Sequence, residues 1–287
     1  MRRGRLVLAF AAAATLALAG CSSGGDDTEP AATADASETA GGAEGTIKIG
    51  IKFDQPGLGF QDGSEYTGFD VDVAKFVAGE LGYGEDQIEW VQAPSAQRET
   101  LLQNGQVDMI FATYSITDKR KEVVSFAGPY FVAGQDLLVA ADDDTITGPE
   151  DLEGKNLCSV TGSTSAQRIK DEHAAGTNLL EQPGYAECVT ALTAGTVDAV
   201  TTDDIILAGL AAVPANEGKV KVVGNPFSEE NYGVGIPKES DKCEAINEAI
   251  TKMIDDGTWQ ELLDANVGAS GYQANEELNP PTPDACA

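Results

Sequence analysis

Basic residues are scarce in this sequence. The 287 residues contain 18 lysines and arginines against 47 aspartates and glutamates, and the formal net charge is −29. A chain this acidic repels polyanions, which argues against nucleic acid and anionic membrane surfaces as partners. Histidine occurs once, at position 173, within a charged stretch, and there is no CxxC pair. We therefore expect no metal site, no cofactor and no histidine-based catalysis.

Long hydrophobic runs are also lacking, except at the N-terminus. There, basic "MRRGR" precedes the apolar "LVLAFAAAATLALA", and the next residues end in Leu18-Ala19-Gly20-Cys21, which resembles a bacterial lipobox. We expect residues 1–20 to be a signal peptide and Cys21 to be diacylated, so that two acyl chains hold the protein at the extracellular face of the cytoplasmic membrane. The alternative is a plain secretory signal followed by a chance cysteine.

The segment after Cys21 lacks the residues that build a core. Residues 22–45 contain no aromatic residue, leucine, isoleucine or valine, and they carry six acidic residues without a basic one. Such a segment buries too little apolar surface to offset its ordering entropy. We therefore predict that residues 21–45 form a flexible acidic tether.

Four cysteines remain once Cys21 is assigned to lipid. An even number fits an oxidising compartment, and four cysteines allow three pairings. The most local choice is Cys158 with Cys188 and Cys243 with Cys286. On the chain-entropy model each of these bonds would stabilise the fold by roughly 4 kcal/mol.

The remaining residues alternate between strand and helix patterns. We predict strands at 46–53, 87–92 and 107–114, separated by helices at 68–83 and 95–105, with Ser95 as a candidate N-cap. This β-α-β-α-β order favours a parallel sheet. A related unit recurs, because "LLQNGQVDMIFATYS" and "ALTAGTVDAVTTDD" share a helix, Gly, Val-Asp and an apolar strand. We expect an α/β protein of two lobes with a ligand cleft between them.

Six motifs in order resemble one protein family. They are "GFDVDVAKFVAGEL", "LLQNGQVDMIFATYSITDKRKEVVSFAGPY", "DLEGKNLCSVTGST", "GTVDAVTTD", "NYGVGIPK" and "DGTWQELL". Together they are similar to bacterial extracellular solute-binding proteins for polar amino acids, the receptors of ABC importers. "IKFDQPGLGF", "PSAQRETL" and "FATYSI" resemble the glutamate-binding lipoproteins of Gram-positive bacteria most closely.

The resemblance implies a type II periplasmic-binding-protein-like fold, with a hinge between its lobes and a central cleft. Lobe 1 would comprise residues 46–132 and 230–287, and lobe 2 residues 133–229, with hinge segments near 131–135 and 225–232. It also implies a monomer whose lobes close over the ligand, for an ABC permease and ATPase to recognise.

The resemblance assigns the ligand's α-carboxylate to Arg120, whose planar donor pair matches two oxygens. Thr113 and Ser115 would add donors from the end of a strand. The alternative for Arg120 is a surface ion pair with Asp118 or Glu122, which would contribute little.

The ligand ammonium would be received by Asp203, with Asp204 as its competitor for that role and otherwise as a helix N-cap. Thr164, where a strand leads into a helix, is a further predicted contact, and its alternative is an ordinary N-cap.

Arg98 is the residue expected to determine specificity. Acidic-amino-acid receptors of this family carry an arginine at this position, and a ligand side-chain carboxylate left unpaired in a closed cleft would be unfavourable. The two arginines would then serve the two carboxylates of glutamate or aspartate. Lys52, at the end of the first strand, is predicted as a third contact or an exposed strand-end lysine. Tyr114 and Phe53 are candidates to line the cleft.

Three other functions remain open at this point. A glutamine receptor would leave Arg98 without a carboxylate partner. A surface sensor would report amino acids to a signalling protein. An enzyme resembling cyclohexadienyl dehydratase would use the same fold, but the sequence offers no nucleophile-base pair, so we expect a non-enzymatic binding protein.

Overall fold

The computed structural model of the protein describes residues 43–173 and 176–286. All of them belong to one compact unit, Ala40–Ala287. The predicted signal peptide (1–20), the predicted lipidation site Cys21 and the predicted tether up to residue 42 lie outside the described residues. Among the helices of the described part, none is both long enough and apolar enough to cross a membrane.

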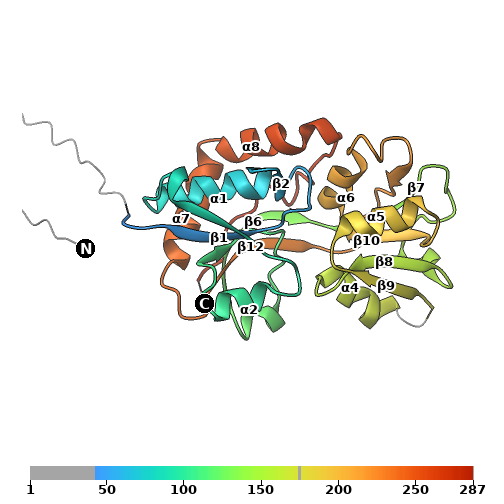
Figure 1. The fold of residues 1–287 in the computed structure, drawn as a ribbon, viewed down its shortest axis with the longest axis horizontal. Coiled ribbons are helices and arrows are strands. Elements are labelled where there is room, and N and C mark those ends of the chain that lie inside the picture. Colours follow the sequence, from blue (N-terminus) through green and yellow to red (C-terminus); the bar gives the residue numbers. More distant parts are fainter. Residues whose placement is uncertain (1–42, 174–175, 287) are drawn as a thin grey trace, which may run out of the picture. The chain divides into compact units, whose positions relative to one another are not determined.

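The first of two five-stranded sheets has the order β4-β1-β5-β12-β6 (Figure 1). β1, β4 and β5 are parallel, because α1 and α2 make the crossovers, and β12 and β6 run antiparallel to their neighbours. The strands are β1 (Ile47–Ile51), β4 (Ile88–Gln92), β5 (Met109–Ile110), β6 (Ser125–Ala133) and β12 (Glu230–Ile236). The helices are α1 (Phe69–Glu80), α2 (Arg98–Gln103), α3 (Asp118–Lys121), α7 (Cys243–Asp255) and α8 (Thr258–Val267). The smaller elements are the hairpin of β2 (Phe60–Asp62) and β3 (Glu65–Thr67) and the short helices η1 (Glu85–Gln87) and η4 (Gly268–Ser270). We call this sheet with its helices lobe 1.

The second sheet has the order β11-β7-β10-β8-β9, and its helices pack around it to form lobe 2 (Figure 1). β8, β9 and β10 are parallel, whereas β7 pairs antiparallel with β10 and β11. The strands are β7 (Gln135–Ala140), β8 (Asn156–Val160), β9 (Asn178–Gln182), β10 (Ala199–Asp203) and β11 (Val220–Val222). The helices are η2 (Pro149–Leu152), α4 (Thr164–Arg168) with its π-helical continuation η3 (Ile169–His173), α5 (Tyr185–Thr193) and α6 (Asp204–Ala211).

The repeated Val-Asp motif plays the same structural role in both lobes. A glycine with positive φ ends the helix in each unit, Gly105 (63°) and Gly195 (70°). The aspartate that follows accepts a hydrogen bond from the neighbouring strand, because Asp108 Oδ2 lies 2.8 Å from Lys48 N and Asp198 Oδ2 lies 2.7 Å from Asn156 N. The recurrence therefore reflects one supersecondary unit used twice.

Two chain segments connect the lobes where β6 leads into β7 and where the chain returns to β12 (Figure 1). They touch at Gln135, whose N–H donates to Ser228 Oγ (3.0 Å) and whose C=O accepts from Phe227 N (2.8 Å). A Cβ at Gly134 would lie 2.6 Å from Pro226 Cβ, so this crossing requires glycine. The predicted hinge segments coincide with this crossing.

The predicted apolar face of the first helix is buried in lobe 1. Phe69, Val73 and Val77 of α1 are fully buried, and Phe76 and Leu81 pack at the edge of the same core. The next helix differs from its prediction, because α2 begins at Arg98 and its N-cap is Gln97, without a side-chain cap bond. Ser95 does not cap this helix; a turn closed by Gln97 N and Pro94 O separates it from α2.

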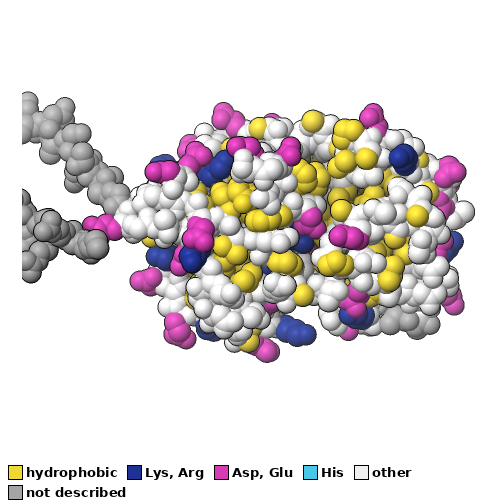
Figure 2. Space-filling model, in the orientation of Figure 1, with side chains coloured by type: hydrophobic (Ala, Val, Ile, Leu, Met, Phe, Trp, Pro, Cys, Tyr) yellow, Lys and Arg dark blue, Asp and Glu magenta, His cyan; other side chains and the backbone are white. Residues whose placement is uncertain are grey.

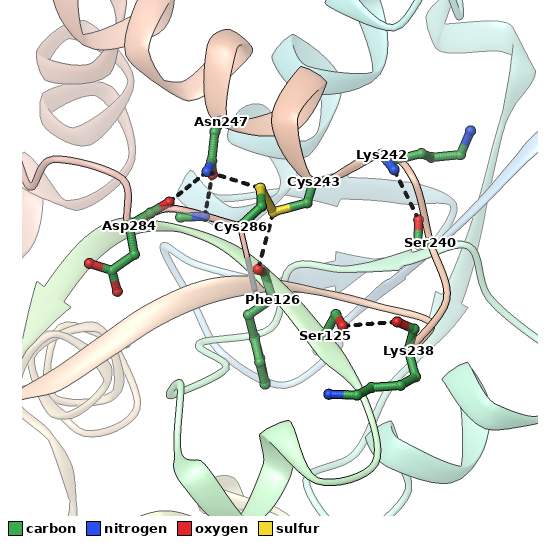
Figure 3. The surroundings of a disulfide bond; sticks show 10 residues. Ser125, Phe126, Lys238, Ser240, Lys242, Cys243, Asn247, Asp284 and Cys286 are labelled. Atoms are coloured by element: carbon green, nitrogen blue, oxygen red, sulfur yellow. Dashed lines mark hydrogen bonds between the residues drawn. A yellow bond between two sulfur atoms is a disulfide. The ribbon is translucent and has the colours of Figure 1, made fainter.

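Both disulfides of the most local pairing are present. Cys158–Cys188 joins β8 to α5 inside lobe 2, and Cys243–Cys286 joins the first residue of α7 to the C-terminal tail. Figure 3 shows Asn247 beside the second bond, where its Nδ2 donates to Asp284 O (2.8 Å). Its Oδ1 accepts from Gly128 N (2.7 Å), so this side chain ties the tail to β6.

Candidate functional site between the lobes

A narrow polar cavity lies where the two lobes meet, with a volume of about 10 Å³. It contains six of the seven predicted ligand contacts, all except Lys52. Its lining from lobe 1 is Gln55, Ser95, Arg98, Thr113, Ser115 and Arg120. Its lining from lobe 2 is Ser163, Thr164, Ser165, Tyr185, Thr202, Asp203 and Ile206.

The lobes touch around this cavity. Arg120 Nη2 donates to Gly162 O across the interface (3.2 Å), and Ser115 Oγ lies 3.3 Å from Thr164 Oγ1. Gly162 has a φ of 80°, and a Cβ there would lie 2.7 Å from Ala96 Cα of lobe 1. Only a glycine allows this backbone approach, so the cavity is enclosed by close packing as well as by hydrogen bonds.

Arg98 is a buried cation that is only partly satisfied. Its side chain starts from the first residue of α2, and the residue is 3% exposed. Nη1 donates to Ala112 O (2.9 Å) and, at 3.4 Å, to Thr113 O, whereas Nε has no hydrogen-bond partner. Within the described residues no carboxylate forms an ion pair with it. Burial and the neighbouring Arg120 charge lower the pKa of Arg98, because both disfavour the charged form.

Arg120 is held from three sides. Nε lies 3.2 Å from Glu99 Oε1, Nη1 donates to Ser115 O (2.7 Å) and Nη2 donates to Gly162 O. Its ion-pair partner is thus Glu99, rather than Asp118 or Glu122 as the surface alternative proposed. Since each Nη atom carries two N–H groups, one on each remains for a ligand carboxylate.

The Tyr114 ring lies against both arginines. Its centroid is 4.5 Å from Arg98 Cζ and 4.8 Å from Arg120 Cζ, within the range of cation–π interactions. The ring is fully buried and is backed by Gly235, where a Cβ would lie 2.6 Å from Tyr114 Cε1. This ring therefore gives two neighbouring guanidinium groups a rigid, favourable surface. Tyr114 does not itself line the cavity.

Thr113 has a strained backbone at the edge of the cavity. Its φ of 47° makes it the one non-glycine residue with positive φ in residues 43–173 and 176–286. For a β-branched residue this conformation is an outlier that costs about 1–3 kcal/mol and persists only when its surroundings enforce it. Asp70 Oδ2 accepts the Thr113 N–H (2.9 Å), and Gln55 Nε2 donates to Thr113 Oγ1 (3.2 Å).

Asp203 and Asp204 have different surroundings, which separates their roles. Asp203, the last residue of β10, is 3% exposed and lines the cavity, where Tyr232 O–H donates to its Oδ2 (2.6 Å). Asp204 instead accepts from Gly134 N (3.3 Å) and Tyr272 O–H (3.2 Å) at the lobe connection. Asp204 is the first residue of α6 and does not occupy its N-cap position, which Asp203 holds without a side-chain cap bond.

The carboxyl of Asp203 has a raised affinity for protons. Burial and the nearby charge of Glu230 raise its pKa to about 8, although the Tyr232 hydrogen bond opposes this shift. An ammonium group placed against this carboxylate would reverse the shift, because an opposite charge favours the ionised form.

Ser163, not Thr164, caps the helix at the lobe 2 side of the cavity. Ser163 Oγ accepts from Ala166 N (2.9 Å). Thr164 is the first helical residue, and its hydroxyl faces Ser115 across the interface. The capping alternative for Thr164 is therefore wrong.

Lys52 lies next to the central cavity without lining it. Its side chain is buried, and Nζ lies 3.3 Å from Asp54 Oδ1 and 5.8 Å from the centroid of the Tyr185 ring. Burial lowers the pKa of Lys52, and Asp54 opposes that shift. The cavity that Lys52 does line is a neighbouring one of about 440 Å³, with walls from both lobes.

Several residues of the site were not predicted from the sequence. Gln55, Tyr185 and Thr202 line the cavity, and Asp70 and Glu99 support its walls. Glu99 carries a local sequence cue, since it adjoins Arg98. Asp70 and Tyr232 carry none, because they reach the site only through the tertiary fold.

The chain matches the family described as bacterial extracellular solute-binding proteins, family 3, over residues 47–269. It is 45% identical to the glutamate-binding protein GluB of Corynebacterium glutamicum over 277 residues, which cover 92% of this chain and 90% of that protein. It is 38% identical to the glutamine-binding protein GlnH of an ABC transporter in Bacillus subtilis, over 87% and 91% of the two chains. An ancestral arginine-binding protein bound to arginine has a similar structure, with a TM-score of 0.71 and 36% identity over 77% of this chain and 98% of that one.

These relatives are binding proteins rather than enzymes, and the expectation of a non-enzymatic protein is confirmed by them. The two-lobed α/β fold predicted from the motifs is likewise that of the solved relatives. With its cavity between two such lobes and a family match over most of its length, the chain belongs to the bacterial extracellular solute-binding proteins of family 3.

Proposed function

We propose that this protein is the lipid-anchored receptor of an ABC importer and that it binds glutamate or aspartate between its lobes. The observation that carries the proposal is Arg98, a buried guanidinium without a carboxylate partner among the described residues, in the same cavity as Arg120 and Asp203. A buried charge is stable only when it is paired, so the cavity favours a ligand that brings a second carboxylate.

In the proposed complex, the two free N–H groups of Arg120 bind the α-carboxylate, with Thr113, Ser115 and Thr164 adding hydrogen bonds. Asp203 binds the ammonium group, and Arg98 binds the side-chain carboxylate. Lys52 remains a predicted contact whose reach would extend from the neighbouring cavity. The two arginines lie in lobe 1 and Asp203 in lobe 2, so the ligand bonds both lobes only in the closed state.

The proposal includes the domain organisation. Residues 46–132 with 230–287 would move as lobe 1 against residues 133–229 as lobe 2, about the crossing at Gly134 and Gln135. Cys21 would carry the lipid anchor, and a permease and an ATPase would be the partners. Support comes from the family match and from the name of the Corynebacterium relative.

Glutamine is the second candidate ligand, favoured by the Bacillus relative, which is named as a glutamine-binding protein. It shares the α-carboxylate and the ammonium group of glutamate but offers Arg98 only a neutral amide. The two candidates therefore differ at Arg98.

Isothermal titration with glutamate, aspartate, glutamine and arginine tests the proposal. We expect glutamate or aspartate to bind most tightly. We expect Arg98→Ala to weaken the affinity for that ligand on the order of 100-fold, since truncating one partner of a buried charge pair costs about 2–5 kcal/mol. Lys252→Ala is the matched control, because it removes the same charge from an exposed ion pair between Lys252 of α7 and Glu80 of α1. A wild-type preference for glutamine or arginine, or unchanged binding in Arg98→Ala, would contradict the assignment.

A further inference from the structure

A buried carboxylate outside the cavity supports the strained residue at its edge. Asp70 lies in the first turn of α1 and is fully buried. Its Oδ2 accepts from Thr113 N (2.9 Å), and its Oδ1 accepts from the Tyr130 hydroxyl (2.7 Å). No lysine or arginine of the described residues forms an ion pair with it. Burial raises the pKa of Asp70, and besides these two hydrogen bonds only the nearby Arg98 charge lowers it and favours the ionised carboxyl, so the position of Asp70 needs an explanation.

The bond to Thr113 fixes a peptide that the chain would not otherwise adopt. Thr113 has φ 47°, which disfavours β-branched residues, so an external contact must hold it. Asp70 supplies that contact from another element, 43 positions earlier in the chain. The Tyr130 hydroxyl in turn fixes the carboxylate, so the acceptor oxygen cannot rotate away without losing a second bond.

The same peptide segment holds Arg98. Arg98 Nη1 donates to Ala112 O (2.9 Å), which belongs to the same peptide unit as the Thr113 N–H that Asp70 binds, and to Thr113 O (3.4 Å) of the next unit. A change in the Thr113 backbone therefore moves the acceptors that orient the guanidinium. Tyr130, Asp70, Thr113 and Arg98 form a continuous series of hydrogen bonds from the core of lobe 1 to the cavity.

We propose that Asp70, fixed by Tyr130, is a positioning residue for ligand specificity, because it holds the Thr113 peptide that orients Arg98. The inference rests on the proposed function in that Arg98 binds the ligand's second carboxylate. It adds that this selectivity depends on a carboxylate that never touches the ligand.

Replacing Asp70 separates a positioning role from a purely structural one. In Asp70→Ala neither Thr113 N–H nor the Tyr130 hydroxyl keeps its acceptor, and we expect the ratio of glutamate to glutamine affinity to fall about tenfold, as for the loss of one buried hydrogen-bond partner. Asp70→Asn is the matched control. Its amide oxygen accepts from Thr113 N and its NH₂ donates to the Tyr130 oxygen, so the ratio should stay within about threefold.

Thr113→Gly supplies an independent check, because glycine adopts positive φ without strain. In the Thr113→Gly background, Asp70→Ala should lower the affinity ratio by less than about threefold, since the peptide no longer needs the carboxylate to hold it. Should Asp70→Ala fail to fold, Tyr130→Phe removes the bond that fixes the carboxylate, and the ratio should fall in the same direction. An Asp70→Ala protein with a lower Tm but an unchanged ratio would overturn the inference.

A measurement without ligand distinguishes failure of this inference from failure of the proposed function. Hydrogen exchange of the Thr113 amide, followed by NMR in the full chain, should be slow in the wild type and in Asp70→Asn, and at least about tenfold faster in Asp70→Ala. Equal exchange in all three overturns the inference whatever the ligand proves to be. If Asp70→Ala loses the slow exchange but the wild-type protein prefers glutamine, the positioning role is supported and the glutamate assignment is rejected.

Discussion

Ligand binding should depend on pH near neutrality because of Asp203. With the lobes arranged as in this structure, burial and the charge of Glu230 raise the pKa of this carboxyl to about 8. In the proposed complex the ligand ammonium needs the ionised form, so ligand binding would lower that pKa and expel a proton. At pH 7 most of a proton should be released per ligand bound. The apparent affinity should fall by up to about 50-fold from pH 8 to pH 6, or ~2 kcal/mol, because the pKa without ligand lies above the pKa of the complex.

Isothermal titration at several pH values, in buffers of different ionisation enthalpy, measures both the affinity and the proton release. Asp203→Asn should bind weakly and release no proton. Glu230→Gln is a second control, because it removes a charge that raises the Asp203 pKa while keeping an oxygen for the Arg168 hydrogen bond. Its affinity profile should shift to lower pH. Constant wild-type affinity between pH 6 and pH 8 without proton release would refute the reasoning.

Three further changes test other parts of the structure. Replacing Cys243 and Cys286 together by alanine should lower the free energy of unfolding, measured by urea denaturation, by about 4 kcal/mol. A loss below about 1 kcal/mol would show that the C-terminal tail detaches before the lobe unfolds. Tyr114→Phe should keep the wild-type glutamate affinity, because the hydroxyl makes no hydrogen bond within the described part. Tyr114→Leu should weaken glutamate binding about tenfold, because it removes both cation–π contacts. Equal titration curves for the two variants would contradict this. Lys52→Met should weaken glutamate binding more than about threefold, because it removes a buried cation that the proposed complex uses as a contact. A smaller change by titration would show that Lys52 only pairs with Asp54.

The sequence predicts the regular parts of the fold well, since they follow from local periodicity. α1, β1 and the repeated helix-Gly-Val-Asp-strand unit occupy the predicted positions because each has an apolar pattern of the right period and a glycine stop. β6 is among the strands that were not predicted. β6 contains Gly128 and Pro129, which interrupt a strand pattern, and only its pairing with β12 makes it a nine-residue strand.

Within the site, the motifs predict which residues meet but not how each is held. Arg98, Arg120 and Asp203 line one cavity, as the resemblance implied. Their partners come from distant parts of the chain, for example Tyr232 for Asp203 and Asp70 for Thr113. Such pairs have no local pattern, because they depend on the packing of separate elements. The left-handed backbone of Thr113 is equally invisible, since a β-branched residue argues against it.

Although basic residues are scarce, two of the arginines lie together in the cavity between the lobes. Acidic side chains are spread over the face shown in Figure 2, with fewer basic ones among them. In saline this surface field is screened within about 8–10 Å, so it weakly opposes an approaching anion. In the cavity, Arg98 and Arg120 are buried and poorly screened, and their attraction for carboxylates is much stronger there than in water. Under the proposed function, the surface charge would therefore act mainly on the rate of encounter, whereas the two arginines would determine which ligand stays bound.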